Sequence, residues 1–135
     1  MAEAAALLAE VERRLNAPCL MERRPMAPSL AAMATSLGLR LPRHTATHAM
    51  ALDPQRLVWA TAGSLYPDHV IFLGPSATAL PADSVAAAVT VAQSHGRKLF
   101  LVPGHGALLS PATTASADEL ALCLALVLEL SLIHI

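Results

Sequence analysis

The chain has 135 residues, enough for one domain with a substantial core or for part of a larger protein. Hydrophobic residues make up 55% of it and charged residues only 14%, so we expect a partner to cover part of its surface. The formal net charge of −1 and the scattered basic residues exclude the strongly basic surface typical of a nucleic-acid-binding protein.

The N-terminal segment and the cysteines indicate a cytoplasmic protein. Glu3 and Glu10 interrupt the first apolar run, and no basic stretch precedes it, so this run does not read as a secretory signal. Cys19 and Cys123 lie far apart and outside any CxxC motif, as expected of reduced thiols. Glu129 interrupts the apolar C-terminal segment, which favours a buried helix over a membrane span.

The first half of the chain is predicted to be helical, with breaks between the helices. Apolar residues at helical spacing predict an amphipathic helix over residues 2–15. Residues 17–28 contain several prolines and no periodicity, and we interpret them as a linker. A short helix is expected over residues 29–37, and another over 54–61 with Asp53 as its cap.

The centre of the fold is predicted to lie in the next stretch. Residues 70–73 and 99–102 are continuous apolar runs, typical of parallel strands buried on both faces. Residues 82–95 carry a helical apolar stripe between them, and residues 107–109 follow as a possible short strand. A long helix is expected from Ser110-Pro111 to about residue 129. The spacing of the two runs fits a right-handed parallel crossover.

These elements predict an α/β fold. We expect a small, mostly parallel sheet of two to three strands with flanking helices, preceded by a detached N-terminal helix and the linker.

Four residues in the turns are candidates for ligand binding: Gly74, Gly104, His105 and Gly106. They follow the two predicted strands, and the carboxyl ends of parallel strands are where α/β sheets bind ligands, through backbone amides among other groups. The Gly104-x-Gly106 pair lacks the third glycine of a dinucleotide loop, which favours a plain turn. His105 could act as a ligand or a general base, although no carboxylate or nucleophile is expected beside it. We predict no catalytic residue and no metal ligand.

His44, His48 and the Asp68-His69 pair are interpreted as residues that support the fold rather than as site residues. His44 and His48 would share one helix face, a spacing that can hold a metal, but no third ligand is evident nearby. We therefore interpret one as solvated and the other as packed at the edge of the core. Asp68 and His69 precede the first predicted strand and are interpreted as a turn residue and an edge residue.

Three stretches together resemble the C-terminal part of class II aldolase/adducin-family proteins. They are LLAEVERRL, HTATHAMALDPQRLVWATAGSLYPDHVIFLGP and LFLVPGHGALLSPATTASADELALCLALVL. The PDHVI element and the VPG-x-G turn are their most specific parts, and the similarity covers nearly all of residues 5–128. The family turn more often has a small apolar residue where His105 stands, so His105 is not expected to carry inherited chemistry.

The resemblance implies a domain organisation and an α/β/α fold. Residues 1–16 would be the last helix of an upstream aldolase-like domain, 17–28 the linker and 29–130 a C-terminal accessory domain. Residues 131–135 fit neither the helical stripe nor the family, and we expect them to be an artefactual tail.

The resemblance also implies a function for the longer parent protein, a lyase of carbohydrate metabolism acting on sugars or sugar phosphates. Its zinc would be held by an HxH motif and a later histidine upstream of this chain, which contains no HxH. The expected partners are that missing aldolase domain and a second copy of the chain. Two alternatives stay open: a nucleotide- or phosphate-binding α/β module, and an interaction domain that uses the apolar last helix.

Overall fold

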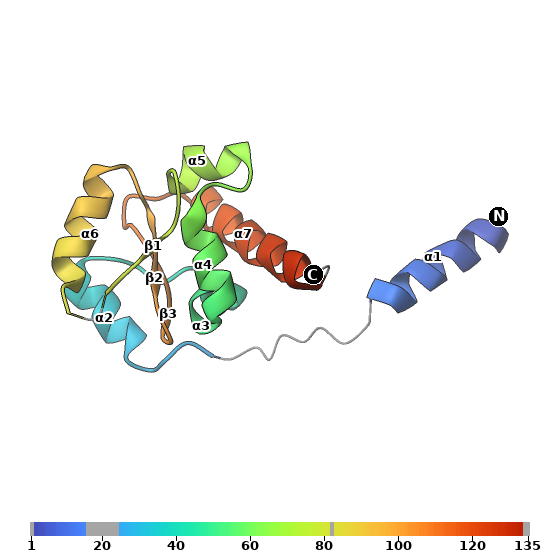
Figure 1. Ribbon diagram of the computed structural model, residues 1–135, viewed down its shortest axis with the longest axis horizontal. Coiled ribbons are helices and arrows are strands. Elements are labelled where there is room, and N and C mark those ends of the chain that lie inside the picture. Colours follow the sequence, from blue (N-terminus) through green and yellow to red (C-terminus); the bar gives the residue numbers. More distant parts are fainter. Residues whose placement is uncertain (1, 16–24, 82, 134–135) are drawn as a thin grey trace.

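The structure is a computed structural model that describes residues 2–15, 25–81 and 83–133 (Figure 1). Most of the predicted linker, Cys19 and the last two positions of the predicted tail lie outside the described residues. The elements are α1 (Ala2–Leu15), α2 (Leu30–Leu37), a 3-10 helix η1 (Thr45–His48), α3 (Ala49–Leu52), α4 (Pro54–Ala62), α5 (Pro67–Leu73), β1 (Thr78–Ala79), α6 (Val85–Ser94), β2 (Leu99–Val102), β3 (Gly106–Leu109) and α7 (Ala115–Ile133).

The described strands form one mixed sheet in the order β1-β2-β3. β1 pairs with β2 in parallel, with Thr78 opposite Phe100, whereas β2 and β3 form an antiparallel hairpin with Leu99 opposite Leu109. Arg40 adds an isolated antiparallel bridge to Leu109 at the outer edge of β3. The α/β class is therefore confirmed, but the prediction of a mostly parallel sheet is wrong.

Residues 70–73 belong to helix α5, so their prediction as a strand is wrong. Pro67 stands in the first turn of this helix, where its fixed φ suits a helical start, and Tyr66 before it is extended. His69 and Leu73 are buried while Ile71 is exposed, as expected of a helix that packs on one side. Four apolar residues are too few to distinguish a helix from a strand by periodicity.

The parallel partner of β2 is instead Thr78–Ala79, which follows α5. Helix α6 connects these two strands, so the predicted strand–helix–strand unit exists with a different first strand. Leu73 still lies beside the start of β2, because its carbonyl oxygen accepts a hydrogen bond from the Lys98 amide at 2.9 Å.

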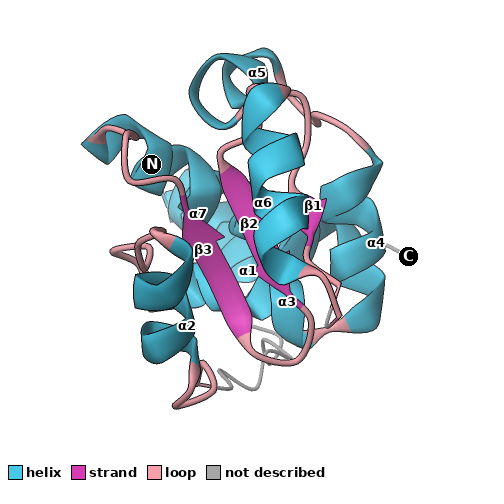
Figure 2. Cartoon of the chain, turned by 90° about the vertical axis from the view of Figure 1, so that its left-hand side faces the viewer, coloured by secondary structure: helices cyan, strands magenta, loops and turns pink. Residues whose placement is uncertain are grey.

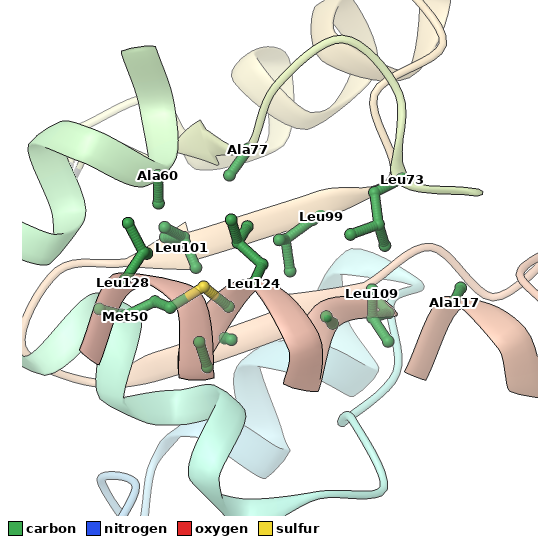
Figure 3. Close-up of a cluster of buried hydrophobic side chains, with 14 residues drawn as sticks. Met50, Ala60, Leu73, Ala77, Leu99, Leu101, Leu109, Ala117, Leu124 and Leu128 are labelled. Carbon is green, nitrogen blue, oxygen red and sulfur yellow. The ribbon is translucent and has the colours of Figure 1, made fainter. Parts of the chain in front are cut away.

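The sheet is the middle of three layers, with α3, α4, α5 and α7 on one face and α2 and α6 on the other (Figure 1). Figure 2 shows β2 and β3 side by side with helices around them. Leu99 and Leu101 of β2 face the first layer, where Leu124 and Leu128 of α7 meet them (Figure 3). Phe100 and the other alternate residues of the hairpin face the second layer. Burial on both faces explains why the sequences of these strands are continuously apolar.

Several helices begin or end at the capping residues and glycines from which their ends were predicted. The Asp53 carboxylate caps α4 by accepting a hydrogen bond from the Arg56 amide at 2.9 Å. Gly38 and Gly96 follow α2 and α6 with left-handed φ values of 66° and 72°. Helix α7 begins only at Ala115 rather than at Ser110-Pro111. Within the described ranges, no helix has the length and apolar character needed to cross a bilayer.

Helix α1 lies apart from the layered domain in Figure 1. Its apolar residues Leu7, Leu8 and Val11 are exposed. The helix predicted over residues 2–15 is therefore confirmed.

Candidate functional site

Gly74 lies where α5 ends and turns toward β1. Its amide donates a hydrogen bond to the Val70 carbonyl oxygen at 3.2 Å, and its φ is 90°. A Cβ atom at this position would collide with the carbonyl oxygen of Gly96 and with Cα of Arg97. The close approach of two backbone segments, rather than an open cradle, accounts for glycine here.

Gly104 and His105 form the turn of the β2–β3 hairpin. The Gly104 amide donates to the Ala51 carbonyl oxygen at 2.8 Å, and the His105 amide donates to the Val102 carbonyl oxygen at 2.9 Å. The His105 carbonyl oxygen accepts from the Ala27 amide at 2.8 Å, so the turn is fastened to two neighbouring segments. The His105 ring donates from Nδ1 to the Pro103 carbonyl oxygen at 3.0 Å and stays partly exposed.

The structure does not bring Gly74 and the Gly104–Gly106 turn together. Gly74 packs beside residues that precede β2, whereas Gly104 follows β2, so the strand separates them by about 13 Å at ~3.3 Å per residue. The amides of Gly74, Gly104 and His105 already donate to backbone carbonyl groups. A phosphate group would therefore have to displace hydrogen bonds of the fold to use them.

Gly106 is buried against His48. The His48 Nδ1 atom accepts a hydrogen bond from the Ala107 amide at 3.1 Å, and a Cβ on Gly106 would lie 2.7 Å from that nitrogen. Burial lowers the pKa of His48, which keeps the ring neutral and able to accept. His48 thus joins η1 to β3 as a structural residue.

His44 and His48 do not converge on one point. The His44 Nε2 atom contacts Glu119 Oε1 at 2.8 Å at the surface, while His48 is buried with Ala107 as its partner. His44 is thus the solvated histidine of the prediction, and His48 is the packed one. Among the described residues, no group of three or more His, Cys, Asp or Glu side chains could hold a metal ion.

An ion pair that the sequence did not reveal joins half-buried Arg40 to buried Asp118. The guanidinium donates to both carboxylate oxygens, at 3.0 and 2.8 Å, and Asp118 is 1% exposed. The Arg43 amide donates to Asp118 Oδ1 at 2.8 Å, and Arg40 also donates to the Thr113 hydroxyl at 2.7 Å. Burial alone would raise the pKa of Asp118, but the hydrogen bonds from Arg40 and Arg43 and the charges of both arginines lower it. The cluster ties the segment beside β3 to the first turn of α7.

His69 is fully buried on the inner side of α5, and neither ring nitrogen has a hydrogen-bond partner within the described structure. Its ring centroid lies 5.6 Å from that of Tyr66, whose hydroxyl donates to the Leu120 carbonyl oxygen of α7 at 2.7 Å. Burial lowers the pKa of His69. The prediction of His69 as an edge residue is wrong, since it lies inside the α5–α7 contact.

Replacing His69 with leucine should make the domain more stable and less sensitive to acid. The ring leaves two buried nitrogens unsatisfied, which costs about 1–3 kcal/mol. Its folded-state pKa lies below the value of about 6.5 in the unfolded chain, so stability is complete above that pH and falls as the pH drops below it. Urea unfolding at pH 7.5 and 5.0 measures this loss, which we expect to be smaller in the variant than in the wild type.

The matched control for this prediction is His105→Leu, because the His105 ring is partly exposed at the surface. We expect His69→Leu to reduce the loss of stability between pH 7.5 and 5.0 more than this control does. Some dependence should survive in His69→Leu, because His48 is also buried with a lowered pKa. Equal losses in the wild type and His69→Leu would contradict the assignment.

Six exposed apolar side chains lie on α4, α5 and α7 and in the loop between α4 and α5, and both α4 and α5 pack on α7. We call this surface the α4–α5–α7 face, and its exposed residues are Val58, Leu65, Val70, Ile71, Leu126 and Leu130. Ile71 and Leu126, for example, are 65% and 47% exposed. Comparisons with protein-family models, with curated proteins and with solved structures found no match.

Proposed function

We propose that the chain is a C-terminal accessory domain of a class II aldolase-like protein that acts on sugars or sugar phosphates, and that it is not catalytic alone. Its role is to pack on the neighbouring catalytic domain through the α4–α5–α7 face. The observation that supports the proposal is that six large apolar side chains on these elements are exposed in the present chain. The family resemblance of residues 5–128 supports the identity of the neighbour.

Energetics support a covered face. Burying a large aliphatic side chain stabilises a complex by about 1.5–3 kcal/mol when the side chain is otherwise fully exposed. The side chains of the α4–α5–α7 face are roughly half exposed, so each contributes about half that amount. Several such contributions together are enough to hold two covalently linked domains in contact.

In this proposal the zinc and the reacting sugar are held by the upstream domain. His44 and His48 do not converge on a zinc site, because His44 contacts Glu119 and His48 contacts the Ala107 amide. The accessory domain stabilises the catalytic domain and shapes its surface. It is expected to cover an apolar side of the catalytic domain or to border the substrate entrance.

The test uses the chain extended by the protein sequence encoded upstream of Met1. An HxH motif in frame with this chain would supply the metal ligands that the proposal requires. We expect hydrogen exchange of α5 and α7 to be slower in the extended protein than in the present chain. The double variant Ile71→Asp/Leu126→Asp should abolish that protection in the extended protein. It should change the stability of the present chain by less than about 0.5 kcal/mol, since both residues are exposed.

The control variant is Ala86→Asp, at an exposed position of α6 in the opposite layer. It should leave the exchange of α5 and α7 unchanged. An upstream sequence without metal ligands, or equal exchange in the two forms, would overturn the proposal. Self-association of the present chain that the double variant removes would assign the face to a second copy instead.

A further inference from the structure

A groove runs between α6 and the edge strand β1, in the layer opposite the α4–α5–α7 face. Its volume is about 490 Å³, and it is lined by Thr78, Ser84, Ala87, Ala88, Val91, Ala92, His95 and Arg97. Small-molecule sites commonly have about 300–1,000 Å³, so the groove is large enough for one. None of the backbone turns discussed above contributes to it.

The lining gives the groove an elongated shape with an apolar middle. Ser84 and His95 mark its two ends along α6, about 16 Å apart at ~1.5 Å per helical residue. Alanines and Val91 lie between them, and their small side chains leave the space that a larger residue would fill. Val91 is 58% exposed, so the apolar floor is open to solvent in the chain by itself.

One end of the groove carries the positive charge of Arg97, which forms no ion pair with a carboxylate among the described residues. Within this part of the chain, its guanidinium donates a long hydrogen bond, 3.5 Å from Nη1 to the Thr78 hydroxyl oxygen. No acidic side chain is among the lining residues. In contrast, Arg40 is fully engaged by Asp118 elsewhere in the fold. The planar fork of an arginine suits two oxygens of a carboxylate or phosphate group.

We propose that this groove binds an amphiphilic oxyanion, a carboxylate or phosphate head on an apolar chain. Arg97 binds the head, with the Thr78 hydroxyl beside it as a second donor. The alanines and Val91 of α6 contact the apolar chain. His95 borders the same end, with Nδ1 donating to the Val91 carbonyl oxygen at 2.8 Å. The proposal does not depend on the accessory-domain proposal, because the groove lies entirely within the present chain.

The experiment titrates the purified chain with octanoate, octyl phosphate and neutral 1-octanol, and follows binding by calorimetry and by amide chemical shifts. We expect saturable one-to-one binding of at least one anion, with shifts concentrated on α6 and β1. The neutral alcohol should bind about tenfold or more weakly, because it cannot form the charge-assisted hydrogen bonds. The tighter of the two anions identifies the head group.

Two variants and a control separate binding from folding. Arg97→Gln should weaken anion binding about tenfold or more. Val91→Glu, at an exposed position, should do the same by placing a negative charge in the groove. Arg13→Gln removes a positive charge from α1, where Arg13 pairs with Glu10, and should leave binding unchanged. Absence of saturable binding by the wild type, equal affinity for octanol, or equal affinity in both groove variants would overturn the proposal.

Discussion

Gly74→Ala should destabilise the domain by about 3 kcal/mol or more, since two costs add. The φ of 90° and ψ of −175° at this residue lie in a region that essentially only glycine adopts, at a cost of about 1–3 kcal/mol for other residues. The added Cβ also collides with the Gly96 carbonyl oxygen and with Arg97 Cα, which are backbone atoms that no rotamer change can move aside. Urea unfolding at pH 7.5 measures the loss.

The matched control is Gly38→Ala, which isolates the conformational cost. Gly38 has a left-handed φ of 66°, and an added Cβ would meet no atom within 4 Å. Gly38→Ala should therefore lower the free energy of unfolding by only about 1–2 kcal/mol, the usual penalty for a non-glycine residue in the left-handed region. Equal losses in the two variants would show that the backbone approach at Gly74 relaxes easily. A larger loss at Gly74 would establish that the α5–β1 connection is packed tightly against the start of β2.

Local signals allowed the helix ends to be predicted from sequence. Asp53 and Pro54 together specify a helix start, and Gly38 and Gly96 specify ends, because each acts on backbone groups only a few residues away. β2 was also predictable, since a strand buried on both faces has a continuously apolar sequence.

The errors arose where local sequence does not decide the structure. Residues 70–73 form an apolar run too short to distinguish a helix from a strand, and in the structure they belong to a helix that packs on α7. β1 has two residues, too few for any pattern, so the true parallel partner of β2 could not be recognised. The prediction of Gly74 and Gly106 as ligand-binding residues stays a prediction, and the structure adds that each lies against other atoms of the fold.

Contacts between residues far apart in the sequence could not be predicted from the sequence. Arg40 and Asp118 are 78 positions apart, and His48 and Ala107 are 59 apart. Nothing in the local pattern of either partner identifies the other. The groove beside α6 belongs to the same class, because Thr78 and Arg97 meet only when β1 and β2 pair. The family relationship, the parent's zinc and its substrate stay predictions.

Replacing Asp118 with asparagine should destabilise the domain by about 2 kcal/mol, less than the loss typical of a fully buried ion pair, since the Arg40 side chain is 27% exposed. The variant leaves the Arg40 guanidinium, held beside Thr113, without its carboxylate. Glu119→Gln is the matched control, since Glu119 is 60% exposed and its contact with His44 lies at the surface. It should change the free energy of unfolding by less than about 1 kcal/mol.

The pH dependence of unfolding gives this prediction a second measurement. The pKa of Asp118 is lowered in the folded state, so its contribution is present above the unfolded value of 3.8 and is lost as the pH falls below it. The contributions of the buried histidines are lost at higher pH, from about 6.5 downward, because their folded-state pKa values are lowered. Wild-type stability should therefore fall in two steps, and Asp118→Asn should weaken only the more acidic one. An unchanged acidic step in that variant would show that other carboxylates, and not the Arg40–Asp118 pair, control acid unfolding.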